Sequence, residues 1–180
     1  AVSIACAGGI PVLIDVNHEQ LLKVKKYLET NFEVRVGAYT VDITNEQDVE
    51  KSKYEIIKSF GKIDGLINNA SNNPKFDTSD KDNFTRLENF PASIWLQDIS
   101  VGLTGAFLCC KHFGMEMTKN SSGGVIVNIS SDLGIVGPNQ NLYSQRDYPN
   151  DQDPVKPVTY SVVKFGIIGL TKYISTYWPT

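Results

Sequence analysis

Short apolar runs alternate with longer amphipathic stretches along this 180-residue chain. The apolar runs are bounded by polar residues or glycine, as buried strands of a parallel sheet are, and they lie near 11–15, 34–39, 63–68 and 124–130. The stretches between them have apolar residues three and four positions apart and predict helices near 18–30, 45–60, 92–118 and 158–177. Strands that alternate with helices in this way predict a doubly wound parallel sheet in a three-layer α/β/α arrangement.

Polar side chains follow the predicted strands where each strand ends. Asp15 closes the run that starts at Pro11, Asn68 closes the run that starts at Ile63, and Ser130 and Ser131 close a third. In sheets of this kind ligands bind outside the carboxyl ends of the strands. The sequence therefore predicts a ligand site at this edge.

Tyr160 and Lys164 stand four positions apart in the last predicted helix, in the stretch Tyr160-Ser161-Val162-Val163-Lys164. Residues at this spacing lie on one face of a helix. An ammonium group beside a phenol favours the ionised phenol, and such a phenol is a good acid or base for interconverting an alcohol and a ketone. Alone, this spacing is a weak signal, because it occurs by chance in many helices and would then be interpreted as a solvated surface pair.

Together these motifs resemble the short-chain dehydrogenase/reductase family. The matching residues occur in family order over nearly all of the chain: Asp15, Asp42, Asn68-Asn69-Ala70, Asn128-Ile129-Ser130-Ser131, and Tyr160 with Lys164. More narrowly, the stretches 101–109 and 156–161 are similar to the branch linked to flagellin and surface-glycan modification. The resemblance implies a Rossmann-like NAD-binding domain and a small-molecule substrate.

The resemblance also implies a role for each matching residue. Catalysis is assigned to Ser131, Tyr160 and Lys164, and cofactor binding to Asp15, Asp42, Ile43, Asn68, Ala70, Tyr160 and Lys164. A carboxylate at the position of Asp15 accepts both ribose hydroxyls and repels a 2′-phosphate, which favours NAD over NADP. The alternative for Asp15 is a charge at a helix N-terminus capped by Asn17, and Asp42 could also cap the helix that starts near Asn45.

Two catalytic positions have competitors. Ser130 precedes Ser131, and consecutive strand residues face opposite ways, so the two serines are alternatives and Ser131 is preferred. Tyr143 has the shorter family spacing from Ser131, but Asp147 stands four residues beyond it and would disfavour the phenolate. Tyr160 is therefore the expected acid/base, and Tyr143 is expected to contact substrate.

Gly102 departs from the family pattern, because relatives have an asparagine in the corresponding Asn-x-Thr-Gly motif, where it holds a water that links the lysine to solvent. Two explanations are open for this glycine. The proton relay is rebuilt or impaired, or the missing side chain makes room for packing or for ligand.

Two polar, proline-containing stretches, 71–91 and 137–157, follow predicted strands and are expected to cover the ligand site. Arg86 lies in the first and could bind a phosphate or carboxylate, or pair with Glu88. Arg146 and Lys156 in the second are weaker candidates of the same kind.

The first family strand and its glycine-rich, pyrophosphate-binding turn have no counterpart in this sequence. Gly8-Gly9 precedes the strand at 11–15 and is expected to end a helix. The last family strands are missing as well, so 1–180 is expected to be a single, partial Rossmann-like domain, truncated at both ends.

Composition excludes several other classes. The formal net charge of −3 argues against a nucleic-acid surface, and no apolar run is expected to span a bilayer. Cys6, Cys109 and Cys110 form no disulfide or metal pattern, and His18 and His112 have no partners at ligand spacing, so no metal site is expected. The thiols fit a reducing cytoplasm.

The sequence thus predicts a cytoplasmic, NAD(H)-dependent oxidoreductase that interconverts a secondary alcohol and a ketone, on a sugar or sugar derivative. A homodimer or homotetramer is expected through the helices near 92–118 and 158–177. The alternatives are a non-catalytic nucleotide-binding or scaffold subunit, and an epimerase or dehydratase that uses tightly held NAD.

Overall fold

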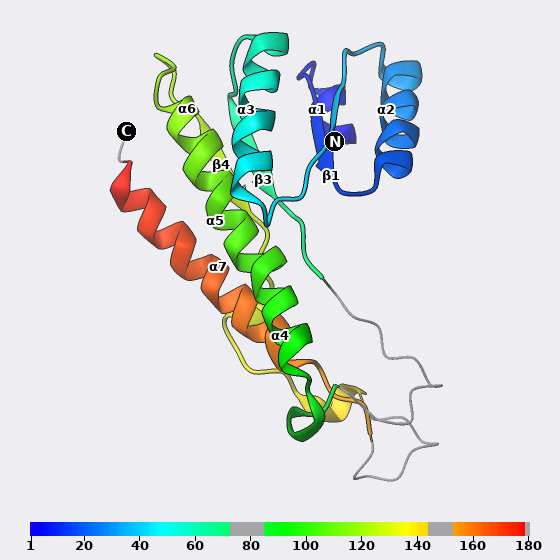
Figure 1. Ribbon diagram of the computed structural model, residues 1–180, viewed down its shortest axis with the longest axis vertical. Helices are drawn as coiled ribbons and strands as arrows, with labels where there is room; N and C mark the ends of the chain where they lie inside the picture. Colours follow the sequence, from blue (N-terminus) through cyan, green and yellow to red (C-terminus); the bar gives the residue numbers. More distant parts are fainter. Residues whose placement is uncertain (73–84, 144–152, 179–180) are drawn as a thin grey trace. The chain divides into compact units, whose positions relative to one another are not determined.

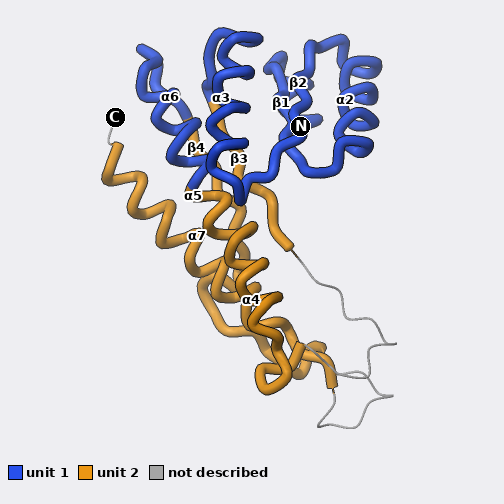
Figure 2. The backbone as a smooth tube through the Cα atoms, in the orientation of Figure 1, with its two compact units in different colours: residues 1–64, 108–124 blue, residues 65–107, 125–180 orange. Residues whose placement is uncertain are grey.

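The structure is a computed structural model that describes residues 1–72, 85–143 and 153–178. The chain forms two compact units (Figure 2). Unit 1 comprises Ala1–Asp64 and Leu108–Gly124, and unit 2 comprises Gly65–Phe107 and Val125–Thr180. The single domain expected from the sequence stays a prediction, and each unit has its own sheet and its own core.

Unit 1 contains a parallel pair of strands, β1 (Val12–Asp15) and β2 (Gly37–Thr40), with Val12 opposite Gly37 and Asp15 opposite Thr40. The other elements of this unit, drawn in Figure 1, are α1 (Val2–Cys6), α2 (His18–Phe32), α3 (Glu46–Phe60) and α6 (Met115–Met117), with a π-helical turn (Cys110–Gly114) before α6. Ala5, Leu28 and Val36 form a core cluster, so α1, α2 and the residue before β2 pack against one another.

Asparagine side chains set the first turns of the two long helices in unit 1. The Asn17 side chain accepts a hydrogen bond from the backbone N–H of Gln20 at 2.9 Å, and Asn45 Oδ1 accepts from Gln47 at 3.0 Å. The Asn17 cap was predicted from the sequence. For the second helix the sequence offered Asp42 as the cap, but the capping residue is Asn45, and Asp42 instead accepts hydrogen bonds from Thr44. After α1, Gly8 has a φ of +77°, which confirms that this glycine occupies a left-handed position at a helix end.

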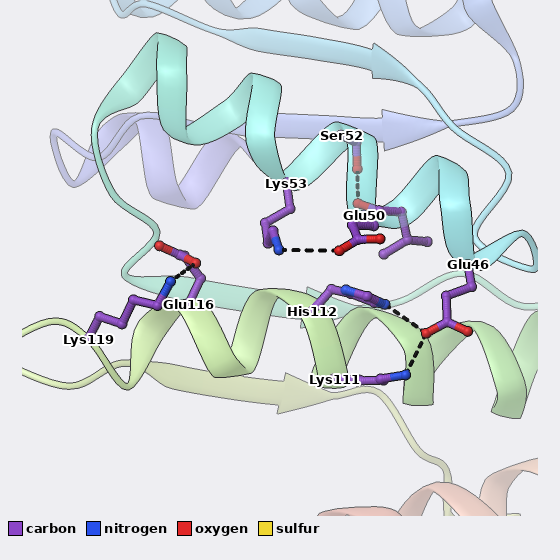
Figure 3. Close-up of polar contacts among 9 residues, drawn as sticks. Glu46, Glu50, Ser52, Lys53, Lys111, His112, Glu116 and Lys119 are labelled. Atoms are coloured by element: carbon purple, nitrogen blue, oxygen red, sulfur yellow. Dashed lines mark hydrogen bonds and ion pairs between the residues drawn. The ribbon is translucent and has the colours of Figure 1, made fainter.

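An ion-pair cluster joins α3 to residues 111–112, which are distant in sequence (Figure 3). Glu46 Oε1 lies 2.5 Å from Lys111 Nζ and 3.0 Å from His112 Nε2. The hydrogen bond from Lys111, and to a lesser extent the one from His112, holds the pKa of the Glu46 carboxyl below its usual value. The carboxylate also lies in the first turn of α3, where the helix dipole favours a negative charge.

Unit 2 pairs β3 (Gly65–Asn68) with β4 (Val125–Asn128), again in parallel, with Asn68 opposite Asn128. Its helices include α4 (Ala92–Ile99), which continues through a π-helical turn (Ser100–Thr104) into α5 (Gly105–Cys109). Unit 2 contains α5 only as far as Phe107. The other long helix of this unit is α7 (Val158–Tyr177). Short 3-10 turns lie at Leu87–Asn89, Asp132–Gly134 and Gln140–Tyr143. Ala106, Val163 and Ile167 form the core cluster between these helices.

Each predicted strand and helix is present within a few residues of its expected bounds. One packing expectation was wrong in part. For the helix near 158–177, the sequence suggests that Ile167, Ile168 and Leu170 give more apolar surface than one sheet face needs, which would favour self-association. Ile167, however, is 3 % exposed and lies in the core, and Leu170 packs against the same cluster. The large apolar side chains that α7 exposes are instead Val162, Phe165, Tyr173 and Tyr177.

The expectation that no apolar run could span a bilayer needs correction. The helical run Ala92–Met117 is long and apolar enough to do so by length and composition alone. This is weak evidence, because the core helix of a soluble protein passes the same test, and this run contributes Ala106 and Cys110 to the buried residues.

Candidate functional site

The lysine and tyrosine predicted as a catalytic pair lie one turn apart at the start of α7. Lys164 Nζ is 5.6 Å from the centroid of the Tyr160 ring. The Lys164 side chain is buried, with 7 % of the residue exposed, and Nζ donates a hydrogen bond to Ile129 O at 2.8 Å. Lysine side chains are rarely buried, and burying an ammonium group is costly unless it is hydrogen-bonded. The structure therefore argues against the alternative that Lys164 is a solvated surface residue.

Ser130 and Ser131 have different partners. Ser130 Oγ donates to Lys164 O at 2.8 Å, which ties the end of β4 to α7. A Cβ at Gly134 would lie 2.5 Å from Ser130 Oγ and 2.7 Å from Lys164 O, so only glycine fits where this loop meets the helix. The Ser130 hydroxyl therefore has a structural role at the junction of β4 and α7. Ser131 remains the preferred candidate for the substrate contact.

The Ser131 hydroxyl interacts with the next turn of the chain. Its Oγ donates to Asp132 Oδ1 at 2.6 Å and accepts from Leu133 N at 3.2 Å. The hydrogen bond from Ser131, followed by one from the Leu133 backbone, lowers the pKa of the Asp132 carboxyl. To donate to a substrate oxygen, this hydroxyl must rotate away from Asp132.

A second lysine lies over the face of Tyr160. Lys156 Nζ is 3.7 Å from the ring centroid, the geometry of a cation–π contact. The Thr85 hydroxyl accepts from Val155 N at 3.1 Å, and Arg86 Nη1 donates to Asp153 O at 3.5 Å. These bonds join residues of the two polar stretches that the sequence expects to cover the ligand site. That covering role stays a prediction.

Arg86 forms the ion pair that the sequence left open, with Nε 2.6 Å from Glu88 Oε1. That contact lowers the pKa of the Glu88 carboxyl. Tyr143 is half-buried at the end of a 3-10 turn, and its substrate role stays a prediction. Arg146 and Asp147 lie outside the described residues.

The Asn68 side chain has structural partners. Its Nδ2 donates to Asn128 Oδ1 at 2.8 Å and to Ala106 O at 3.5 Å, and Asn128 Nδ2 donates to Thr171 Oγ1 at 2.9 Å. The two register-paired asparagines thus link β3 and β4 to the neighbouring helices. Ala70 is exposed just beyond β3. Cofactor contacts of Asn68 and Ala70 stay predictions.

In unit 1, the carboxyl edge of the β1–β2 pair has two exposed carboxylates. Asp15 ends β1, and its Oδ1 accepts from Asn17 N at 2.9 Å. Asp42 Oδ1 accepts from the backbone N–H of Thr44 at 2.9 Å and from its hydroxyl at 2.7 Å, and Ile43 beside it is half-buried. Asp15 accepts this bond with one carboxylate oxygen, and a carboxylate is the kind of acceptor that the donating ribose hydroxyls of a nicotinamide cofactor require. The cofactor contacts of Asp15, Asp42 and Ile43 stay predictions.

Gly102 is explained by packing. A Cβ at this position would lie 2.6 Å from Val163 Cγ1 and 3.2 Å from its Cγ2. Any side chain here would collide with the residue that directly precedes Lys164. Of the explanations left open by the sequence, room for packing is the one that this contact supports.

Comparison with known proteins agrees with this arrangement. A family model described as short chain dehydrogenase matches residues 1–145. The chain therefore belongs to the short chain dehydrogenase family.

Relatives of several activities are similar to this chain. A short chain dehydrogenase/reductase of Gibberella zeae is 29% identical over 182 residues and is matched over 58% of its length. A post-translational flagellin modification protein A of Campylobacter coli is 25% identical, over 93% of this chain and 60% of its own. An NADP-dependent mannitol dehydrogenase of Alternaria alternata is 26% identical, over 87% of this chain and 50% of its own.

Solved structures share the fold. A crystal structure of NAD+-bound xylitol dehydrogenase superposes with a TM-score of 0.78 at 25% identity, over 98% of this chain and 58% of that one. A levodione reductase gives a TM-score of 0.78 at 26% identity, over 98% and 59%. The fold is accordingly Rossmann-like, and the chain spans somewhat more than half the length of these proteins.

Three residues that sequence reasoning did not single out lie at this site: Asp98, Thr159 and Asp132. Asp98 is 5 % exposed and accepts a hydrogen bond from the Thr159 hydroxyl. A signal was present for Asp98, because an aspartate in the apolar helix 92–118 needs a partner once buried. The partner itself could not be predicted, because it comes from a helix distant in sequence.

Proposed function

We propose that the protein is a nicotinamide-dependent oxidoreductase that interconverts a secondary alcohol and a ketone. The observation that carries the proposal is the buried Lys164 ammonium, held by Ile129 O at 2.8 Å and one helical turn from Tyr160. Membership of the short chain dehydrogenase family supports it.

In this proposal Tyr160 exchanges the proton. In oxidation its phenolic oxygen takes the proton of the substrate hydroxyl, and in reduction it returns that proton to the carbonyl oxygen. Ser131 Oγ rotates from Asp132 to donate to the same substrate oxygen. Lys164, fixed by Ile129 O, places a positive charge near the phenol and contacts the ribose next to the nicotinamide. The bound nicotinamide would supply the hydride acceptor or donor.

We assign Asp15 to the choice of NAD over NADP. Its carboxylate would accept from the adenosine ribose hydroxyls and repel a 2′-phosphate. The similar proteins do not decide between the two cofactors, because one relative is named NADP-dependent and one solved structure is NAD+-bound. The proposed preference for NAD therefore rests on Asp15. Asp42 would bind the adenine amine, with Ile43 beside it.

A polyol, a sugar or a sugar derivative is the proposed substrate. The names of the mannitol and xylitol dehydrogenases support a polyhydroxylated compound, and the flagellin modification relative supports a surface sugar. Localisation in the cytoplasm and assembly into a homodimer or homotetramer complete the proposal. The packing explanation of Gly102 removes one argument for a non-catalytic subunit.

The test is cofactor reduction by the full-length protein with a panel of polyols and sugar derivatives, followed at 340 nm. We expect turnover with NAD, and NADH binding at least about tenfold tighter than NADPH binding, which is roughly 1.4 kcal/mol. Asp15→Ala should narrow that difference. Copurifying NAD that never exchanges, without net turnover on any member of the panel, would indicate an epimerase or dehydratase instead.

A further inference from the structure

Asp98 is a buried acid that the proposed mechanism does not use. It lies in the last turn of α4 and is 5 % exposed. Thr159, in the first turn of α7, is 1 % exposed, and its hydroxyl donates to Asp98 Oδ2 at 2.5 Å. A carboxylate loses much hydration when it is buried, so an apolar residue would be the cheaper choice for packing alone.

The surroundings of this bond are apolar or small. Residues one turn apart along α4–α5 contact residues one turn apart along α7. Asp98 is hydrogen-bonded to Thr159, and Gly102 packs against Val163. Ala106 lies in the core cluster with Val163 and Ile167. All these contacts lie within unit 2. Apolar contacts of this kind are non-directional, so they define the spacing of the two helices better than their register along each other.

The site residues directly follow the contact residues. Tyr160 is the neighbour of Thr159, and Lys164 is the neighbour of Val163. A slip of α7 along α4 would therefore displace the phenol and the ammonium together. The first turn of α7 also has no side-chain cap and no acidic residue of its own, so Asp98 supplies the negative charge that this helix end favours.

From this geometry we infer that the Asp98–Thr159 hydrogen bond sets the register of α7 and so positions Tyr160 for proton transfer. Asp98 and Thr159 are positioning residues that act through the helix and do not touch substrate. The inference rests on the proposed function of Tyr160. A buried polar pair is a suitable register device, because the pair is satisfied at one alignment and leaves an unpaired carboxylate at the others.

The test uses conservative changes in the full-length protein. Thr159→Val removes the hydroxyl and keeps the shape, whereas Thr159→Ser keeps the hydroxyl. We expect Thr159→Val to lower kcat about 10- to 100-fold with little change in KM, the cost of a displaced reacting group. Thr159→Ser should restore kcat. Ile167→Val, which weakens the same helix interface away from Tyr160, should lower the Tm but leave kcat unchanged.

The double variant Asp98→Leu with Thr159→Val separates positioning from stability. Replacing both partners by apolar groups removes the unpaired carboxylate, so the Tm should recover toward the wild-type value. If the pair sets the register, kcat stays low although stability returns. Recovery of kcat together with Tm, or a Thr159→Val variant with wild-type kcat, would overturn the inference alone. A wild-type protein without turnover would overturn the proposed function and this inference with it.

Discussion

Gly102 shows at the scale of one residue why a departure from a family pattern needs a structure. Placing an asparagine there would add a Cβ 2.6 Å from Val163 Cγ1. We expect Gly102→Asn to destabilise the protein by about 1–3 kcal/mol, the usual cost of overpacking, although glycine is the poorer helix former. Urea unfolding of the wild type and the variant measures the difference.

The matched control for this variant is Gly102→Asn combined with Val163→Ala. Removing the Val163 methyl groups takes away the atoms with which the new side chain collides. The double variant should therefore lose less than the sum of the two single changes. Additive losses would show that the collision with Val163 is not the reason for glycine.

The cysteines give a second prediction at this scale. Burial, and to a lesser extent the neighbouring Cys110, raises the pKa of the Cys109 thiol to about 12. Iodoacetamide at pH 8 should modify Cys6, which is exposed, and leave Cys109 and Cys110 unmodified until the protein is unfolded. Peptide mass spectrometry distinguishes the sites, and rapid native labelling of Cys109 would contradict its buried position.

The sign of the pH dependence follows from the same thiol. Its folded-state pKa lies above the ordinary value of 9.0, so its contribution to stability is complete below about pH 9. That contribution is lost as the pH rises from 9 toward 12, because the unfolded chain releases the proton first. Thermal unfolding at pH 8 and pH 10 should show the lower Tm at pH 10, and Cys109→Ala should reduce the difference.

At the scale of an element, the start of α3 shows how local sequence sets a helix. Asn45 Oδ1 accepts from Gln47 N and from Asp48 N, at 3.0 and 3.4 Å. Asn45→Ala removes both bonds and should cost about 1 kcal/mol in the free energy of unfolding. Asn45→Asp keeps the acceptor and is the control. An alanine variant as stable as the wild type in urea would show that this cap contributes nothing.

Elements could be predicted from the sequence because their signals are local. The Asn17 cap, the apolar strand runs and the Tyr160–Lys164 spacing depend on residues a few positions apart. The π-helical turns at Ser100–Thr104 and Cys110–Gly114 were missed, because a one-residue change of helical period hardly alters the apolar pattern. The Asp98–Thr159 bond was missed because its partners are distant in sequence.

The candidate site was predicted as a set of residues but not as a set of contacts. The structure agrees with the placement of Tyr160 and Lys164 on one helix and separates Ser130 from Ser131 by their partners. The bond from Lys164 to Ile129 O, and the position of Lys156 over the Tyr160 ring, depend on how α7 meets the end of β4 and the segment before the helix. Tertiary contacts of this kind leave no periodic pattern in a sequence.

At the scale of the whole molecule, exposed apolar side chains on α4 and α7 favour self-association. Leu96 is 67% exposed and Phe165 is 47% exposed. We expect the full-length protein to form a dimer or tetramer at micromolar concentration, and Phe165→Glu to shift it toward the monomer, because the change places a charge in an apolar interface. Light scattering measures the mass, and a monomeric wild type would contradict the prediction.

The central claim is that Tyr160 is the group that exchanges the proton with substrate, and Tyr160→Phe tests it most directly. The change removes the hydroxyl and keeps the ring on which Lys156 lies. We predict that kcat with the best alcohol of the panel falls about 10²- to 10⁴-fold while NADH affinity stays close to that of the wild type, and that Tyr143→Phe alters mainly KM. An active Tyr160→Phe variant beside an inactive Tyr143→Phe variant would contradict the account.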